Sequence, residues 1–424
     1  EWKESWYKPA VPRKQWFREV FNFRQQFLFF EIPTKSPIYD PEKKIFQMER
    51  AIREDEELFG GIDYLHIFDW AWTPQFGRVG DYDHWEELGG VENFRKAIEE
   101  VHKRGIPVGL YIEGYLVDPQ SNLGKAKGKE WQILDEKGNP MPFFAPSYNM
   151  CPCLPAWREY LSQTYERVKR ETGAKGYYID EFGFAMEARN CWNKSHNHPI
   201  PCSPVRGELL TTKAVREALG DDVVLYTEES PVDVTSQYQD GSFTYAISSI
   251  SDELSPHHLN LYRFVFPDFK TFEIIICDQP LGSNVEAVKR VLFNGEGIWL
   301  EGMKEWFSEE VRDYIKKYHK IVKENADCFT SLHPEPLVPT LIEGVYANKF
   351  PERKDGKGKV IWTIYNTNPF TVEGKIIAVE YEKGARFWDV GEGKEVKPVI
   401  KGGKAYLRLK LPPKEVVVIS GYFP

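Results

Sequence analysis

Cysteine is scarce in this chain, and long hydrophobic runs and an excess of basic charge are missing. Six cysteines among 424 residues are too few for a disulfide scaffold. No stretch of about 18 apolar residues is present, so we expect no membrane span. The 55 basic and 64 acidic residues give a net charge of −9. This charge argues against nucleic acid or an anionic membrane surface as a partner, because both attract a basic face.

Signals for nucleotide binding and for export are also missing. The glycine-containing loops match neither G-x-G-x-x-G nor G-x-x-x-x-G-K-[ST], so nothing supports a nucleotide cofactor. The chain begins at Glu1 without methionine, and residues 1–7 lack the basic and then apolar layout of a signal peptide. We therefore expect that a segment preceding Glu1 has been lost, and we assign neither a cellular location nor an oligomeric state.

Aromatic residues, in contrast, are abundant. They make up 15% of the chain, and hydrophobic residues make up 42%. A chain of this composition folds around a large core and is not disordered. The aromatic content fits two interpretations, a large core or a cleft whose rings stack on sugars.

Short apolar strands alternate with amphipathic helices over most of the chain. The clearest helices cover 92–104, 157–172 and 209–219, and each stops at a glycine. Such alternation is typical of a parallel sheet. Eight strands over this length favour a (β/α)₈ barrel, or TIM barrel, over an open sheet. The expected strands are 27–32, 62–70, 106–114, 176–182, 223–229, 242–246, 272–278 and 298–301.

The pattern changes after residue 333 to strands that have no helices between them. Turns rich in Gly, Pro and Asn separate these strands, which is typical of a β-sandwich. We therefore divide the chain into a lead-in segment 1–20, a catalytic barrel 21–333 and a C-terminal β-sandwich 334–424. The expected sandwich strands are 360–365, 375–379, 385–390, 405–411 and 415–420.

Acidic and aromatic residues recur at the carboxyl ends of the barrel strands, where barrel active sites lie. Successive strand residues face opposite sides, and the side facing the helices must be apolar. By this test Tyr178 and Asp180 point inward on the fourth strand, and Tyr226 and Glu228 point inward on the fifth. The same test places these further residues inside: Glu31, Tyr111, Glu113, Trp299 and Glu301.

Carboxylates that converge at one barrel mouth indicate acid/base chemistry. Their mutual repulsion raises the pKa of individual groups, a cost that active sites exploit. Glycoside hydrolysis uses such a pair: one carboxylate attacks the anomeric carbon, and a protonated one protonates the leaving oxygen. Glu181 and Glu229 remain substitutes for Asp180 and Glu228, because strand ends twist and bulge.

Substrate-binding candidates follow from the same strand ends. The second strand ends in Asp69 and Trp70, and an acidic, aromatic stretch follows at 81–85. Such a loop suits hydroxyl binding with ring stacking, and its alternative is a tryptophan-rich core. His66 is expected to be a core histidine, and Asp240 is a cleft candidate without a role. The inward residues expected to bind substrate are Tyr111, Glu113, Tyr226, Trp299 and Glu301.

A second constellation joins four of the six cysteines to two histidines: Cys151, Cys153, Cys191, His196, His198 and Cys202. Three interpretations stay open. The first is a structural zinc ion; the second is one or two disulfides. The third is free thiols, with His196 or His198 binding sugar. The zinc ligands in the first would be Cys151, Cys191, His196 and His198. In each case the loop follows Asp180 closely and is expected to wall the active site.

Five motifs carry a resemblance to a known family: Trp-Tyr-Lys-Pro at 6–9, Asn-Met-Cys-Pro at 149–152, Gly-Tyr-Tyr-Ile-Asp-Glu-Phe-Gly at 176–183, Cys-Trp-Asn-Lys-Ser-His-Asn-His-Pro at 191–199 and Tyr-Thr-Glu-Glu at 226–229. They resemble a glycoside-hydrolase-like barrel family of unassigned function, domain of unknown function 6259. That family is similar in turn to retaining endo- and exo-acting α-N-acetylgalactosaminidases. The resemblance implies that Asp180 is the nucleophile and Glu228 the acid/base.

The sequence thus predicts a retaining glycoside hydrolase acting on oligosaccharides, polysaccharides or glycoconjugates by double displacement, with no cofactor required for catalysis. One alternative is a carbohydrate-binding barrel that has lost catalysis. Another is a zinc-dependent hydrolase, such as a deacetylase, centred on His196 and His198. The sugar, its anomeric configuration and exo or endo action stay open.

Overall fold

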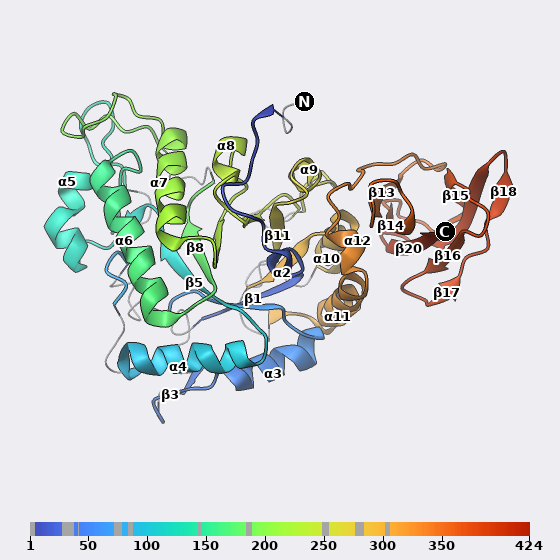
Figure 1. Cartoon of the computed structure of the whole chain (residues 1–424), viewed down its shortest axis with the longest axis horizontal. Helices are drawn as coiled ribbons and strands as arrows, with labels where there is room; N and C mark the ends of the chain where they lie inside the picture. Colours follow the sequence, from blue (N-terminus) through green and yellow to red (C-terminus); the bar gives the residue numbers. More distant parts are fainter. Residues whose placement is uncertain are drawn as a thin grey trace. The chain divides into compact units, whose positions relative to one another are not determined.

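A closed barrel of parallel strands forms the centre of the fold, as predicted (Figure 1). The computed structural model describes residues 5–27, 38–40, 42–71, 79–83, 88–142, 146–183, 189–247, 254–275, 284–301 and 306–424. The barrel order is β1-β12-β11-β10-β9-β8-β5-β4. Its strands are β1 (Asn22–Gln26), β4 (Tyr64–Ile67), β5 (Val108–Glu113), β8 (Gly176–Asp180), β9 (Val224–Thr227), β10 (Gly241–Thr244), β11 (Lys270–Ile275) and β12 (Gly297–Leu300).

The first barrel strand begins earlier than predicted. It is the polar stretch Asn22–Gln26, whereas the prediction was 27–32, of which residues 28–32 lie outside the described residues. All five residues of β1 are buried, and Asn22 donates from its side-chain amide to the carbonyl oxygen of the distant Gly61. Such a bond offsets part of the cost of burying a polar group. The predicted Glu31 lies outside the described residues.

Helices follow most of the strands, and their ends agree with local sequence signals. Gly173, in the left-handed conformation with φ 69°, ends α6, and Ser308 caps α11 by accepting from the N–H of Val311. The α-helices of the barrel region, among the described residues, are α2 (Gln15–Arg18), α3 (Met48–Phe59), α4 (Gly90–Lys103), α5 (Lys129–Trp131), α6 (Pro155–Thr172), α7 (Pro204–Leu219), α8 (Asp233–Ser236), α9 (Leu261–Val265), α10 (Val285–Asn294), α11 (Glu309–Glu324) and α12 (Ala326–Phe329).

Aromatic side chains fill the barrel interior. Tyr226 forms hydrogen bonds through its hydroxyl to the hydroxyl of Tyr64 at 3.1 Å and to Nδ1 of His66 at 3.0 Å. Two glycines leave space for these hydroxyls: a Cβ on Gly109 would overlap both, and a Cβ on Gly176 would overlap that of Tyr64. The rings packed in this interior include Phe23, Tyr64, His66, Tyr178, Tyr226 and Phe243. His66 is therefore a core histidine, as expected.

The chain divides into two compact units. The first consists of Glu1–Phe17, Phe23–Glu54 and Ile62–Thr244, and the second of Arg18–Asn22, Asp55–Gly61 and Tyr245–Pro424. The division falls between β10 and β11, so the second unit contains β11 and β12 as well as the C-terminal sheets. The predicted domain boundaries at 20 and 333 stay predictions.

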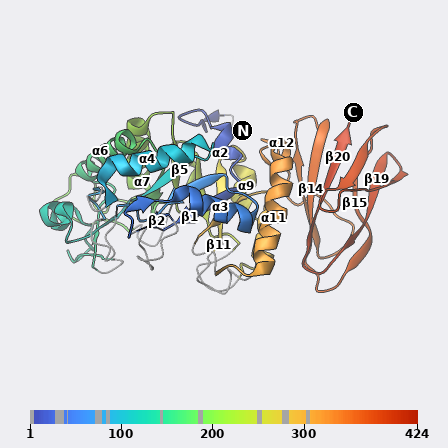
Figure 2. The same ribbon diagram turned by 90° about the horizontal axis from the view of Figure 1, so that it is seen from below.

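Two antiparallel sheets form the C-terminal part of the second unit (Figure 2). One has the order β13-β14-β20-β16-β17, and the other has the order β15-β19-β18. Every second residue of β19 is buried, as expected for a strand with one face on a core. The strands are β13 (Val345–Pro351), β14 (Gly358–Asn366), β15 (Val372–Glu380), β16 (Arg386–Asp389), β17 (Lys394–Glu395), β18 (Val399–Lys401), β19 (Lys404–Leu411) and β20 (Val416–Phe423).

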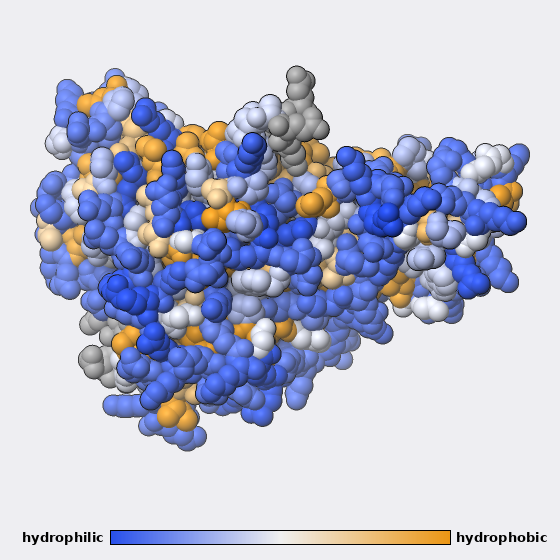
Figure 3. All heavy atoms as spheres, in the orientation of Figure 1, coloured by the Kyte–Doolittle hydropathy of each residue, from blue (hydrophilic) through white to orange (hydrophobic). Residues whose placement is uncertain are grey.

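Charged residues make up 28% of the chain, and a largely hydrophilic surface is expected from this composition. On the face drawn in Figure 3, hydrophilic side chains predominate, and apolar ones gather in small separate groups. Among the helices of the described residues, none is both long and apolar enough to cross a membrane.

Candidate active site

Three carboxyl groups meet at the carboxyl ends of β5 and β8. The two strands pair in parallel with Glu113 opposite Asp180, which brings both side chains to one end of the barrel. Glu181, the next residue, joins them: one carboxylate oxygen from each of the three residues lies within 4.8 Å of the others. This end is the face on which barrel enzymes carry their active sites.

The hydroxyl of Tyr111 lies between two of these groups. It donates to Oδ2 of Asp180 and lies 3.0 Å from Oε2 of Glu113. A hydroxyl has a single hydrogen, so it donates to one carboxyl group and accepts from the other. Burial and the nearby Asp180 raise the pKa of Glu113 well above its usual value. A protonated Glu113 that donates to Tyr111, which in turn donates to Asp180, satisfies all three groups.

An unusual backbone conformation brings Glu181 into this cluster. Strict strand alternation would turn Glu181 away from its neighbour Asp180, but the two carboxyl groups lie together. The φ of Glu181 is 62°, in the left-handed region that non-glycine residues rarely adopt, so alternation stops at Asp180. The backbone N–H of Glu181 donates to Oε2 of Glu228 at 3.1 Å. The turn thus connects the carboxylates of the fourth strand to that of the fifth.

Buried polar groups around the cluster hold it in place; the sequence analysis gave Tyr115 and Glu208 no role and expected Tyr82 in a substrate-binding loop. The N–H of Glu113 donates to the hydroxyl of Tyr82 at 2.6 Å, and Oε1 of Glu113 accepts from the N–H of Tyr115 at 2.9 Å. Glu208 of α7, only 1% exposed, accepts from the hydroxyl of Tyr115 at 2.8 Å and from the N–H of Gly183 at 3.3 Å. The available signal for Glu208 was its position on the buried stripe of α7: Glu208, Thr211, Thr212, Val215 and Leu219.

Glu228 and Glu229 follow β9 directly. β9 ends at Thr227, so strand alternation does not determine which way the side chains of these two residues point. Burial raises the pKa of Glu229 to about 7. A carboxyl group with such a pKa is protonated for much of the neutral range, as a general acid must be. Both glutamates therefore stay candidates for the acid/base.

The predicted substrate-binding roles of Trp70 and Tyr226 require correction, because both side chains are core residues. Trp70 is 2% exposed, donates from Nε1 to the carbonyl oxygen of Tyr111 at 2.8 Å, and stacks on Phe94 of α4. Tyr226 is fully buried among the rings of the barrel interior, which inward side chains fill in a barrel of eight strands.

The loop at 81–85 is partly a supporting element. Both carboxylate oxygens of Asp81 accept backbone hydrogens, from Asn122 at 2.7 Å and Leu123 at 3.0 Å, which fixes the segment after β6 (Leu116–Val117). Residues 84 and 85 lie outside the described residues. Asp69 is buried just after β4, and its role in binding stays a prediction.

Two predicted residues belong to the second compact unit. Trp299 is buried within β12, and Glu301 follows that strand directly. Strand register supports an inward Trp299, since Ile298 and Leu300 pack in the hydrophobic cluster that α10 and α11 form. Substrate binding by Trp299 and Glu301 stays a prediction.

The cysteines and histidines of the second constellation come together in two ways. Cys153 and Cys202 form a disulfide. Cys151, Cys191, His196 and His198 each place one sulfur or nitrogen atom within 4.8 Å of the other three. These residues come from the segment after β7 (Tyr148–Asn149) and from the loop between β8 and α7, so the predicted juxtaposition of the two loops is present.

Both imidazoles are fully engaged inside this cluster. His196 lies 3.5 Å through Nδ1 from Sγ of Cys191, and 2.9 Å through Nε2 from the carbonyl oxygen of Glu130. His198 lies 3.3 Å through Nε2 from Sγ of Cys151, and 2.8 Å through Nδ1 from the carbonyl oxygen of Pro199. Each ring nitrogen thus faces an atom of the protein, and the predicted sugar-binding role of the two histidines stays a prediction.

Comparisons with known proteins agree with this barrel. The protein is a TIM barrel, and several solved structures share this fold: an α-amylase from Anoxybacillus superposes with a TM-score of 0.64 at 14% identity, over 97% of this chain and 99% of that one. The trehalose-6-phosphate hydrolase of Bacillus licheniformis gives 0.66 at 11% identity, over 96% and 100%. An α-galactosidase from Geobacillus stearothermophilus gives 0.63 at 12% identity, over 97% and 56%.

A match to a sequence-family model identifies the family of this chain. The model of a family described as Domain of unknown function (DUF6259) matches residues 5–230, and the chain belongs to that family. A search of curated proteins gives no match. At identities of 11–15% the structural likeness establishes the fold, and the chemistry must be argued from the residues of this chain.

Proposed function

We propose that the protein is a retaining glycoside hydrolase in which Asp180 is the nucleophile. The observation that carries this proposal is the group of carboxyls at the ends of β5 and β8, joined through the hydroxyl of Tyr111. A donor at Oδ2 orients the Asp180 carboxylate. A neutral Glu113 limits the repulsion that a further charge would cause, and so keeps Asp180 available as an anion.

The second role, protonation of the leaving oxygen, falls to the glutamates after β9. We assign it to Glu228, whose side chain is tied to the backbone of Glu181 and hence to the end of β8. Glu229 is the competing candidate, because burial raises its pKa to about 7. In a double displacement the same residue first donates a proton and then activates water.

The substrate class we infer is an α-linked glycoside. The structural relatives bear the names of an α-amylase and an α-galactosidase, and the motifs resemble α-N-acetylgalactosaminidases. We therefore rank α-N-acetylgalactosaminides, α-galactosides and α-glucosides as the first candidates. The β-linked counterparts serve as negative controls.

A panel of p-nitrophenyl α- and β-glycosides, followed by oligosaccharides, tests the proposal. We expect hydrolysis of at least one α-glycoside, and proton NMR should detect the α-anomer first, as retention requires. Asp180→Ala is the control and should be inactive on the same substrate. Initial release of the β-anomer would contradict double displacement. Sugar binding without turnover would favour the carbohydrate-binding alternative.

A further inference from the structure

We propose that Cys151, Cys191, His196 and His198 bind a structural zinc ion that fastens the loop after β8 to the segment before α6. This inference is independent of the proposed glycosidase activity. It combines two of the three interpretations that the sequence left open, because the Cys153–Cys202 disulfide is present beside the four proposed ligands.

The spacing of the four ligand atoms fits tetrahedral zinc. With Zn–S near 2.3 Å and Zn–N near 2.0–2.1 Å, neighbouring sulfur and nitrogen ligands lie about 3.6 Å apart. Two of the sulfur-to-nitrogen distances in the cluster are 3.3 Å and 3.5 Å, close to this value. All four ligand atoms lie within 4.8 Å of one another, so they are gathered closely enough to surround one ion.

The outer nitrogen of His198 supports the same assignment. Its Nδ1 faces the carbonyl oxygen of Pro199, which only accepts, so this nitrogen carries the hydrogen. Nε2 of His198 is then bare and faces Sγ of Cys151. Nε2 of His196 faces both the carbonyl oxygen of Glu130 and the side-chain amide nitrogen of Asn193, and its Nδ1 faces Sγ of Cys191. Metal-binding histidines characteristically donate their second N–H to a carbonyl or carboxylate, which fixes the tautomer and the ring orientation.

The composition of the site indicates a structural role. Four protein ligands complete a tetrahedron and leave no position for a reactive water, whereas catalytic zinc keeps one open. Two thiolates balance the charge of Zn²⁺ in a place where Cys151, Cys191 and His196 are all buried. This closed set argues against the zinc-dependent hydrolase alternative.

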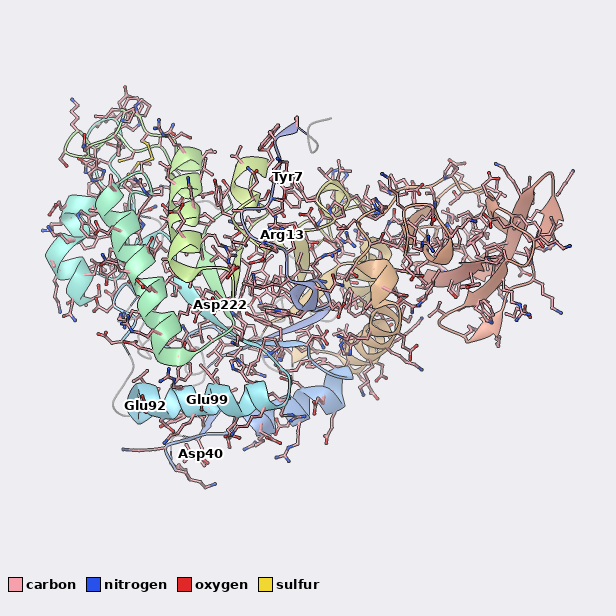
Figure 4. All side chains as sticks on the ribbon, viewed as in Figure 1. Tyr7, Arg13, Asp40, Glu92, Glu99 and Asp222 are labelled. Atoms are coloured by element: carbon pink, nitrogen blue, oxygen red, sulfur yellow. A yellow bond between two sulfur atoms is a disulfide. The ribbon has the colours of Figure 1, made fainter. Side chains whose placement is uncertain are left out.

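The Cys153–Cys202 disulfide already joins the two segments that the zinc ion would connect. Cys191 and Cys202 pair as an antiparallel bridge, with N–H to carbonyl distances of 3.1 Å and 2.9 Å. Cys202 in turn is bonded to Cys153, and these two residues lie just before α7 and α6 (the yellow bond in Figure 4). Zinc and disulfide would together hold the loop that leaves the barrel immediately after Asp180 and Glu181.

The test uses the full chain and the metal alone. We expect about one zinc per chain by elemental analysis. After zinc is removed and Co²⁺ added, absorption bands of tetrahedral cobalt with thiolate charge transfer should appear. Cys191→Ser and His196→Ala should each lose the metal and these bands. Cys328→Ser is the matched control, because Cys328 is also a buried free cysteine but lies in α12. It should keep both.

Two further measurements keep the outcome clear if a variant folds poorly. Chelation of the wild-type protein should lower its Tm by at least about 5 °C, because metal that binds only the folded state stabilises it. Peptide mapping without reduction should recover Cys153–Cys202 as a disulfide and Cys151 and Cys191 as thiols. A Cys151–Cys191 disulfide, or wild-type protein that binds neither zinc nor cobalt, would overturn the proposal whatever the glycosidase assays show.

Discussion

Asp180 and Asp240 lie at opposite ends of nearby barrel strands and have opposite electrostatic surroundings. Asp240 immediately precedes β10, at the amino end, where its carboxylate pairs with Arg216 and accepts from the N–H of Leu225 at 3.0 Å. The ammonium of Lys14 lies 3.8 Å away. Asp180 ends β8, and its neighbours include two other carboxyl groups.

The difference separates a stabilising carboxylate from a reactive one. A buried acid with cationic partners is compensated, so its removal leaves the cations unpaired. A carboxylate placed among other carboxylates destabilises the folded state by repulsion. Proteins retain such a cluster where function requires it. Asp240, which the sequence indicated as a cleft candidate, is therefore a structural residue at the end of the barrel that serves stability.

The largest expected effects come from exchanging these two carboxylates for amides. Asp240→Asn should lower the free energy of unfolding by about 3–5 kcal/mol, because it breaks a buried ion pair. Asp180→Asn should reduce kcat by at least about 10⁴-fold without loss of stability, because it removes a nucleophile and one of several like charges. Urea unfolding and steady-state kinetics on both variants measure the two effects. If Asp240→Asn lost activity while fully folded, the comparison would be wrong.

The second-largest effect concerns the acid/base residue after β9, the strand next to β8, for which Glu228 and Glu229 are the two candidates. Glu228→Gln should slow natural glycosides by about 10²–10⁴-fold and dinitrophenyl glycosides much less, because a good leaving group needs little protonation. Azide should restore turnover by attacking the covalent intermediate, and the glycosyl azide should keep the substrate configuration. Glu229→Gln is the matched control. If it showed this pattern instead, the acid/base would be Glu229.

The smallest effect concerns Glu113 and depends on pH. Because the pKa of Glu113 is raised in the folded protein, the folded state holds this proton more tightly than the unfolded state. Its contribution to stability is complete below the unfolded pKa near 4.5 and is lost as pH rises through the folded value. Glu113→Gln stays neutral throughout, so it should gain stability relative to the wild type as pH increases.

Thermal unfolding between about pH 4 and pH 8 measures this gain, and Glu217→Gln, an exposed acid of α7, provides a control that should show none. The glutamine amide can still donate to Tyr111, so kcat should fall less than about tenfold, whereas Glu113→Ala should lose more. A difference between Glu113→Gln and wild type that did not vary with pH would mean that Glu113 titrates normally.

Local patterns were sufficient for most of the barrel. The predicted strands overlap β4, β5 and the later barrel strands because apolar runs ending at loops are a property of neighbouring residues. The first strand was misplaced because β1 buries polar side chains, one of which, Asn22, bonds to the distant Gly61. Alternation likewise placed Tyr111, Glu113 and Asp180 correctly on one side, and it failed at Glu181, where φ is positive.

By itself, the sequence determined the barrel, the C-terminal sheets, the inward carboxylates of β5 and β8, and the meeting of the cysteine and histidine loops. This information is present in short stretches of sequence, as the alternation of residues in strands, the glycines that end helices and the order of the motifs. Only the tertiary structure decided that Asp240 pairs with Arg216, that Tyr226 and Trp70 are core residues, and that Cys153 bonds to Cys202 and not to Cys151. The physical reason is that partner choice depends on distances between residues remote in sequence, and a linear pattern contains no such distances.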